Sequence, residues 1–277
     1  MSRRFKRICR LFLLALALTG ALLWYDAFRF EPWRPRLYRQ EVCLPGLPPA
    51  FDGFKIIQLS DLHIVKLGER EQRAAQLVTE AQPDLIVLTG DYVTDDGITP
   101  GPQRWRDCTE EAVRFLQPLK APYGKYAVMG NWDNPEVMAR LDQAGAATCL
   151  DNKAIALTKG GERIWLAGTW VAKGGREEAV RRMPRGETCI LLAHYPEVAR
   201  EVAPLGVDLI LAGHYHGGQV NFPFTGPVCG RSTPCVAGLY HVGDSLLYVS
   251  RGLGMHTAAV RFRCRAEVTV LTLRAAR

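Results

Sequence analysis

The chain lacks the closely spaced cysteines that would build a thiolate metal centre. Its eight cysteines are scattered through 277 residues without a CxxC pair, so a thiolate zinc or iron–sulfur site is not indicated. The sequence also has no internal repeat and no low-complexity tract, which excludes solenoid and fibrous architectures. The whole chain is 48% hydrophobic, and its length suits one large α/β domain of about 220–250 residues.

A basic stripe with interleaved aromatic residues is also missing after residue 50, so the net charge of +7 does not indicate a nucleic-acid partner. Much of the positive charge lies near the amino terminus instead. It forms two groups, Arg3, Arg4, Lys6, Arg7 and Arg10 and then Arg29, Arg34, Arg36 and Arg39. Basic residues that flank an apolar segment are more typical of contacts with a membrane surface.

The apolar segment between these groups, residues 11–25, carries no charged residue. With its apolar flanks it approaches the length of about 17–25 residues that spans a bilayer, and a cleavable signal peptide is the alternative. Bulky Trp24 and Tyr25 stand where a signal peptidase needs small residues, which favours an uncleaved single-pass anchor over residues 1–28. The basic residues before the segment favour an extracytoplasmic domain, although those after it oppose this orientation.

Five short polar signatures each follow an apolar run that predicts a strand. They are Asp61-Leu62-His63, Gly90-Asp91, Gly130-Asn131, His194 and Gly213-His214-Tyr215-His216. The preceding runs cover residues 54–60, 84–89, 126–129, 189–193 and 207–212. Because the carboxyl ends of strands in an open α/β sheet lead into one crevice, we expect these side chains to gather there.

Together the signatures supply two Asp, one Asn and four His, enough for two metal ions that share one carboxylate. Imidazole nitrogens and hard oxygens, without a thiolate, suit divalent Mn, Fe, Zn or Ni. Two such ions about 3.5–4 Å apart can hold the attacking and leaving oxygens of a phosphoryl displacement and generate hydroxide at neutral pH. The sequence therefore predicts a metal-dependent hydrolase.

The order of these signatures resembles the pattern of the calcineurin-like metallophosphoesterases, roughly over residues 54–273. The resemblance implies that one metal is held by Asp61, His63 and His216. It implies that the second metal is held by Asn131, His194 and His214. Asp91 would bridge the two metals, and a hydroxide between them would attack phosphorus. The residues that the resemblance implies to be catalytic are Asp91, Asn131 and His194.

The resemblance also implies the fold, a four-layer αββα sandwich of two mixed sheets in residues 51–277. Residues 29–50, rich in Arg and Pro, are predicted to be a linker with a leading strand. Helical spacing predicts a helix over residues 69–81, and Asn134 followed by Pro135 predicts the start of another. Residues 95–108 are predicted to be a loop, and the late strands 164–168, 246–250 and 268–273 are predicted to form a second sheet.

One residue departs from the family pattern. Gly130-Asn131-Trp132-Asp133 has Trp132 where the family usually has a His that contacts phosphate and is thought to protonate the leaving group. An indole donates a hydrogen bond but does not titrate. Either Trp132 only packs beside the site, or general acid catalysis is altered. His241 and His256 are the two histidines outside the signatures that could substitute.

The carboxyl-terminal segments Ser250-Arg251-Gly252-Leu253-Gly254 and Val260-Arg261-Phe262 resemble the membrane-anchored bacterial branch of cell-envelope phosphoesterases. This resemblance implies a phosphorylated lipid or cell-envelope substrate. Asn131 and Arg251 are the predicted substrate-binding residues, with a structural salt bridge as the alternative for Arg251. The alternative function is a membrane-tethered metal-binding protein with little or no turnover.

Overall fold

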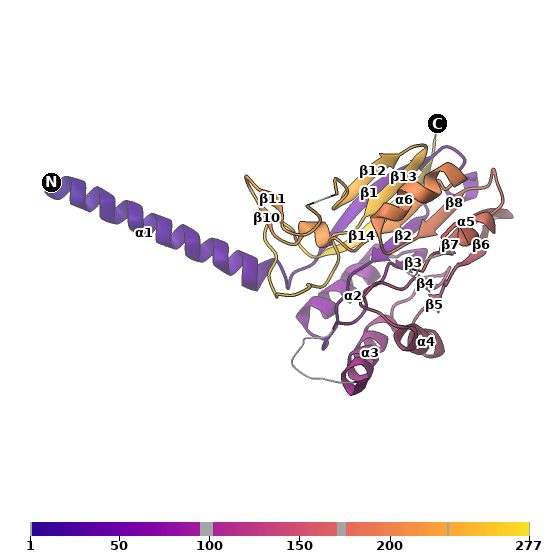
Figure 1. The fold of residues 1–277 in the computed structure, drawn as a ribbon, viewed down its shortest axis with the longest axis horizontal. Coiled ribbons are helices and arrows are strands. Elements are labelled where there is room, and N and C mark those ends of the chain that lie inside the picture. The colour runs from indigo at the N-terminus through magenta and orange to yellow at the C-terminus, as the bar shows by residue number, and fades with distance from the viewer. Residues whose placement is uncertain (1, 95–101, 171–175, 232, 277) are drawn as a thin grey trace.

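The computed structural model describes residues 2–94, 102–170, 176–231 and 233–276. Two six-stranded sheets pack face to face, and helices cover their outer faces (Figure 1). This arrangement confirms the predicted four-layer αββα sandwich of two mixed sheets.

The first sheet carries three of the five signatures. In spatial order its strands are β1 (Arg36–Leu44), β14 (Glu267–Ala275), β2 (Lys55–Leu59), β3 (Leu85–Leu88), β4 (Lys125–Ala127) and β5 (Thr148–Cys149). From β2 to β5 all neighbours are parallel, whereas β14 runs antiparallel to β2 and parallel to β1. The carboxyl ends of β2, β3 and β4 therefore meet at one edge.

The prediction that residues 268–273 belong to the second sheet is wrong, because this strand is β14 of the first sheet. Val268 and Val270 face the core under the helices, whereas Leu271 and Leu273 face the core between the sheets. Burial on both faces gives a continuous apolar run, and such a run identifies a strand without identifying its neighbours.

The second sheet carries the other two signatures. Its strands in spatial order are β12 (Gly238–Val242), β13 (Ser245–Val249), β9 (Leu209–Ala212), β8 (Cys189–Leu192), β7 (Glu162–Gly168) and β6 (Lys153–Lys159). The four central strands are mutually parallel, and antiparallel strands close both edges. A separate two-stranded hairpin of β10 (Asn221–Phe222) and β11 (Gly226–Pro227) follows β9.

The outer layers are short helices. Those on the first sheet are α2 (Glu69–Ala81), α3 (Pro102–Leu116) and α4 (Pro135–Gln143), and those on the second are α5 (Arg176–Arg181) and α6 (Ala199–Val202). Single helical turns lie at Pro49–Phe51, Pro196–Val198, Ala203–Leu205 and His216–Gly218.

The helix starts match the sequence signals with one exception. Asn134 caps α4 by accepting a hydrogen bond from the backbone N–H of Val137 at 3.0 Å. The loop predicted over residues 95–108 is wrong from Pro102 onward, because α3 begins there with proline in its first turn. Residues 95–101 lie outside the described part of the chain.

Helix α1 (Arg3–Tyr25) extends away from the domain (Figure 1), and none of its residues is buried. By length and composition, it is the one helix among the described residues that could cross a membrane. A π-helical turn, Asp26–Phe30, connects it to the domain, where Ala27 is buried. The anchor base is therefore packed against the folded domain.

Candidate metal centre

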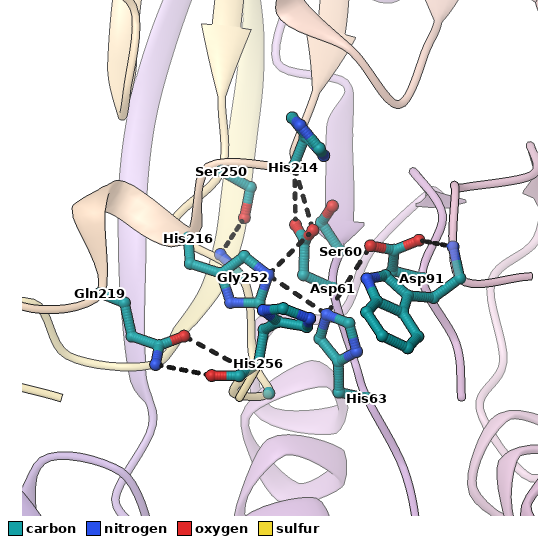
Figure 2. Close-up of polar contacts among 12 residues, drawn as sticks. Ser60, Asp61, His63, Asp91, His214, His216, Gln219, Ser250, Gly252 and His256 are labelled. Carbon is teal, nitrogen blue, oxygen red and sulfur yellow. Dashed lines mark hydrogen bonds and ion pairs between the residues drawn. The ribbon is translucent and has the colours of Figure 1, made fainter. Parts of the chain in front are cut away.

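The seven predicted ligands lie at the carboxyl ends of five parallel strands. Asp61 and His63 follow β2, Asp91 follows β3, and Asn131 follows β4. From the second sheet, His194 follows β8, and His214 and His216 follow β9. The candidate ligand atoms form two groups, and within each group they all lie within 4.8 Å of one another. One group is Asp61, His63 and His216, and the other is Asp91, His194 and His214. Figure 2 shows the first group converging with Asp91 beside it.

The Asp91 carboxylate lies between the two groups. Its Oδ2 atom is 3.7 Å from Nε2 of His63 and 3.2 Å from Nε2 of His194. Asn131 joins the second group through its Oδ1 atom, 2.9 Å from Nε2 of His194. One carboxylate thus lies beside a ring nitrogen of each group, which is where a ligand shared by two metals would lie.

Four imidazole nitrogens of the candidate ligands face one another in two pairs. Nε2 of His63 lies 3.2 Å from Nε2 of His216, and Nδ1 of His214 lies 3.2 Å from Nε2 of His194. Nδ1 of His63 and Nδ1 of His216 are buried without a hydrogen-bond partner in the described part of the chain. Converging nitrogens beside carboxylates are the donor set of a divalent metal, so these residues fit such an ion.

Burial keeps most of these rings neutral, as metal ligation requires. It lowers the pKa of His63 to about 3 and that of His214 to about 4. Burial would also lower the pKa of His194, but the adjacent Asp91 outweighs it and raises that pKa to about 9. A cation at Nε2 of His194 would compete with this proton, so binding there releases a proton.

A contact on the side of the His194 ring that faces away from the ligand cluster fixes the orientation of the ring. Its Nδ1 atom lies 2.8 Å from the carbonyl oxygen of Thr89, the last residue before the Gly90-Asp91 signature. A ring N–H donated from Nδ1 to this carbonyl directs Nε2 toward the ligand cluster, where it has a free lone pair once its proton is lost. Asp61 is held similarly, because its carboxylate accepts the backbone N–H of His214 at 2.9 Å.

Five of the candidate ligands have a left-handed backbone conformation, which residues other than glycine rarely adopt. They are Asp61, His63, Asp91, His214 and His216, with φ of 50°, 44°, 59°, 76° and 52°. Each such residue costs about 1–3 kcal/mol, and these conformations cluster at functional sites. Here they turn the chain sharply at each strand end, which directs successive ligands into one site.

Two glycines of the signatures allow the loops to approach this closely. A Cβ atom on Gly213 would lie 1.9 Å from Oγ of Ser60, and one on Gly130 would lie 2.2 Å from Oδ1 of Asp91. Neither position has room for a side chain. The glycines therefore serve the packing of the candidate ligands against one another.

Sequence reasoning missed a role for Asp133, the last residue of Gly130-Asn131-Trp132-Asp133. Its buried carboxylate accepts three backbone N–H groups, from Asp91 at 2.7 Å, Tyr92 at 2.8 Å and Gly130 at 2.8 Å. These bonds tie the loop after β3 to the loop after β4. The position of Asp133 two residues after Asn131, in the same polar segment, was the sequence feature that could have indicated this role.

We expect Asp133→Asn to weaken metal binding by about 10–100-fold, the usual effect of losing a group that orients a ligand. An amide nitrogen cannot accept the backbone N–H groups, so the free energy of unfolding should also fall by about 1–3 kcal/mol. Metal titration and urea denaturation measure both effects. Exposed Asp244 offers the matched control, Asp244→Asn. Unchanged metal affinity in Asp133→Asn would show that Asp133 does not position the site.

Arg261 is a second residue whose role the sequence did not reveal. It is fully buried and donates to the carbonyl oxygens of Arg251 at 2.9 Å, Gly252 at 3.0 Å and Gly254 at 2.6 Å. A Cβ atom on Gly252 would lie 2.8 Å from Cβ of Asp61, so this segment packs directly on a candidate ligand. The guanidinium therefore holds the wall behind Asp61.

Arg251 forms the salt bridge that was the alternative to phosphate binding. Its Nη1 atom lies 2.8 Å from Oε2 of buried Glu267, and its guanidinium lies over the ring of Tyr38 at 4.7 Å. A contact between Arg251 and substrate phosphate stays a prediction.

Trp132 lies at the edge of the site, where the family places its His. Its backbone N–H donates to Oδ1 of Asp91 at 2.9 Å. Its ring centroid is 4.7 Å from that of His256 and 6.3 Å from that of His63. Of the two unassigned histidines, His256 therefore adjoins the site (Figure 2), whereas His241 is exposed on edge strand β12.

Several curated proteins are similar to this chain over most of its length. The uncharacterized metallophosphoesterase YkuE of Bacillus subtilis is 34% identical and covers 82% of each chain. The phosphodiesterase YaeI of Escherichia coli is 31% identical, over 79% of this chain and 82% of its own. The UDP-2,3-diacylglucosamine pyrophosphatase LpxG of Chlamydia muridarum is 22% identical, over 94% and 95%.

Among solved structures, the sulfate thiohydrolase SoxB of Thermus thermophilus shares the fold, with a TM-score of 0.51 and 13% identity. The match covers 82% of this chain and 57% of that protein. The family model of calcineurin-like phosphoesterases matches residues 54–218, which contain all seven candidate ligands. With this match and the likeness to YkuE, the chain belongs to the calcineurin-like phosphoesterase family.

Proposed function

We propose that the protein uses two divalent metal ions to hydrolyse phosphoester, phosphodiester or pyrophosphate bonds in a lipid or cell-envelope substrate. The observation that supports this most strongly is the Asp91 carboxylate between two clusters of buried ligands. The first ion would be held by Asp61, His63, His216 and Asp91. The second would be held by Asn131, His194, His214 and Asp91.

When bound, the metals would polarise the phosphoryl group and generate a hydroxide nucleophile near neutral pH. The protein positions the groups around them. Thr89 orients His194, and the backbone N–H of His214 orients Asp61. Asn131 is exposed beside His194, which supports the proposal that its side chain contacts a phosphate oxygen of the substrate.

A lipid-like substrate is supported by a groove beside the site. It has a volume of about 570 Å³, and its walls combine the apolar side chains of Trp33, Val65, Trp132 and Met255 with the basic side chains of Lys66 and Arg70. His63 lies at the groove, so one end of it reaches the metal centre. Trp33 follows the base of the anchor helix closely. The groove therefore connects the candidate catalytic centre with the membrane-proximal end of the domain.

Hydrolysis of bis-p-nitrophenyl phosphate by the purified protein with added Mn²⁺ tests this proposal. We expect turnover that chelator abolishes and Mn²⁺ restores. A screen of a lipid extract with the anchored protein would then identify the substrate class. YaeI is named a phosphodiesterase and LpxG a pyrophosphatase, and both reactions fit the proposed site.

The second candidate function is a membrane-tethered metal-binding protein with little turnover. Trp132 is the observation that favours it, because the family's titrating His is replaced. Metal binding without Mn²⁺-dependent hydrolysis of the chromogenic diester would select this function over the enzyme.

We further propose that α1 stays uncleaved and places the domain outside the cytoplasm. The five basic residues before the apolar segment support this orientation. A reporter enzyme that works only outside the cytoplasm should be active when it is fused after residue 277. The mature protein should also keep its first residues. A cytoplasmic reporter would overturn the orientation, and a mature chain starting near residue 27 would overturn the anchor.

A further inference from the structure

The hairpin of residues 220–228 exposes apolar side chains that do not pack into the core of the domain. Among the side chains after Trp33 whose burial the structure describes, the exposed large hydrophobic ones are Val65, Phe222, Phe224 and Val228, and three of these belong to this hairpin. Phe224, between β10 and β11, is 98% exposed. Three exposed apolar side chains gathered on one hairpin are typical of a surface that contacts a partner.

The hairpin and the base of α1 are attached to the same segment of chain. The backbone N–H of Asn221 donates to the carbonyl of Phe262 at 2.9 Å, and the N–H of Arg261 donates to the carbonyl of Ala27 at 3.0 Å. Cys264 donates its backbone N–H to the Glu31 carboxylate at 3.0 Å. Figure 1 shows β10 and β11 at the end of the domain from which α1 leaves.

Exposed basic residues surround this end of the domain. Arg29 and Arg34 lie at the base of α1, and Arg231 follows the hairpin. Arg263 belongs to the segment of residues 261–264, to which both the hairpin and the base of α1 are attached. Arg231 donates its Nε–H to the carbonyl of Pro227, so its side chain lies at the hairpin itself. Apolar tips bordered by arginine match the two layers of a membrane surface, apolar chains below anionic headgroups.

We propose that the hairpin of residues 220–228 is a second membrane contact, with Phe222, Phe224 and Val228 inserted into the same bilayer that α1 enters. The inference rests on the proposed anchor. A few apolar residues on a protruding tip suit shallow insertion, whereas a stable protein partner needs roughly 800 Å² on each side. The exposed arginines would then contact anionic headgroups.

A second contact would fix how the site faces the membrane. A domain attached to the membrane by a single helix can rotate about the axis of that helix. A second membrane contact through the hairpin would restrict this rotation. The hairpin follows His214 and His216 directly through the turn His216–Gly218. Insertion of Phe224 would therefore hold the metal centre and its groove at the bilayer surface, where a lipid substrate arrives.

Photocrosslinking of the full chain tests this inference. Benzoylphenylalanine would replace Phe224, and the protein would be reconstituted in vesicles of phosphatidylcholine and phosphatidylglycerol. The matched control places the same group at Ala156, which is exposed on β6 at the opposite end of the domain (Figure 1). We expect lipid adducts from position 224 and none from position 156, with several-fold fewer adducts when phosphatidylglycerol is omitted.

Two results would overturn the proposal. One is the absence of a lipid adduct at position 224 in protein that floats with the vesicles, and the other is an adduct with a second protein chain instead. Protein that fails to float would refute the anchor and this inference together. Catalysis is separate, because Asp91→Asn should leave the lipid adduct unchanged even if the proposed chemistry is wrong.

An activity measurement adds an independent readout. Phe224→Asp should lower hydrolysis of a long-chain alkyl p-nitrophenyl phosphodiester embedded in these vesicles several-fold relative to Phe224→Leu, which keeps the apolar tip. Both variants should hydrolyse soluble bis-p-nitrophenyl phosphate at the wild-type rate. Equal activity of the two variants on the embedded substrate would contradict a membrane role for the hairpin.

Discussion

Asp91→Asn should lower Mn²⁺-dependent hydrolysis by more than about 10²-fold, because losing even a group that only orients a metal ligand costs about 10–100-fold. Oδ2 of Asp91 lies 3.7 Å from His63 and 3.2 Å from His194, so the same carboxylate serves both clusters. An amide removes its negative charge and one of its two ligand oxygens. A histidine variant would disturb one cluster, whereas Asp91→Asn disturbs both.

The control for Asp91→Asn is the same chemical change at exposed Asp244, which should leave turnover unchanged. Thermal unfolding should show that Asp91→Asn remains folded, because the backbone N–H of Asp91 still bonds to Asp133. Turnover of a folded Asp91→Asn variant within tenfold of wild type would refute the bridging role.

Trp132→His should raise hydrolysis of alkyl phosphodiesters by about 10²–10⁴-fold, the usual contribution of a general acid. Simple alkoxides need a proton as they leave, whereas p-nitrophenolate and phosphate are stable anions. The Trp132 ring lies in the groove wall near His63 and His256, so we expect an imidazole at this position to lie close enough to the leaving group to protonate it. Wild-type protein should accordingly favour pyrophosphates and aryl diesters.

Rates on paired alkyl and p-nitrophenyl diesters measure this effect. Trp132→Phe is the matched control, because it removes the indole N–H without adding a titrating group. Equal gains on both substrates would contradict this account. Alkyl hydrolysis in the wild type that depends wholly on His256 or His241 would also contradict it, since another residue would already supply the proton.

The gathering of the candidate ligands at one edge could be predicted from the sequence because each of them follows a short apolar run. The runs before Asp61, Asp91, Asn131, His194 and His214 are the parallel strands β2, β3, β4, β8 and β9. Parallel strands have both faces covered, so their composition is nearly continuous and easily recognised. Their common direction then places the residues after them at one edge.

Other features depend on contacts between distant segments and could not be predicted. β1 pairs in parallel with β14 over nine residues, from opposite ends of the chain. Buried Arg261 bonds to carbonyl groups of residues 251–254, and no local pattern marks an arginine that lies inside rather than on the surface. The exposure of Phe224 likewise becomes evident only once the surrounding chain is folded.

The metal content of wild-type protein tests the central claim most directly. Protein purified without chelator and equilibrated with excess Mn²⁺, then freed of unbound metal, would be measured by elemental analysis. The proposed site predicts two tightly bound divalent ions per chain, and the Asp91→Asn variant should retain no more than one. One ion or fewer in the wild type would contradict a centre built around a shared Asp91 carboxylate.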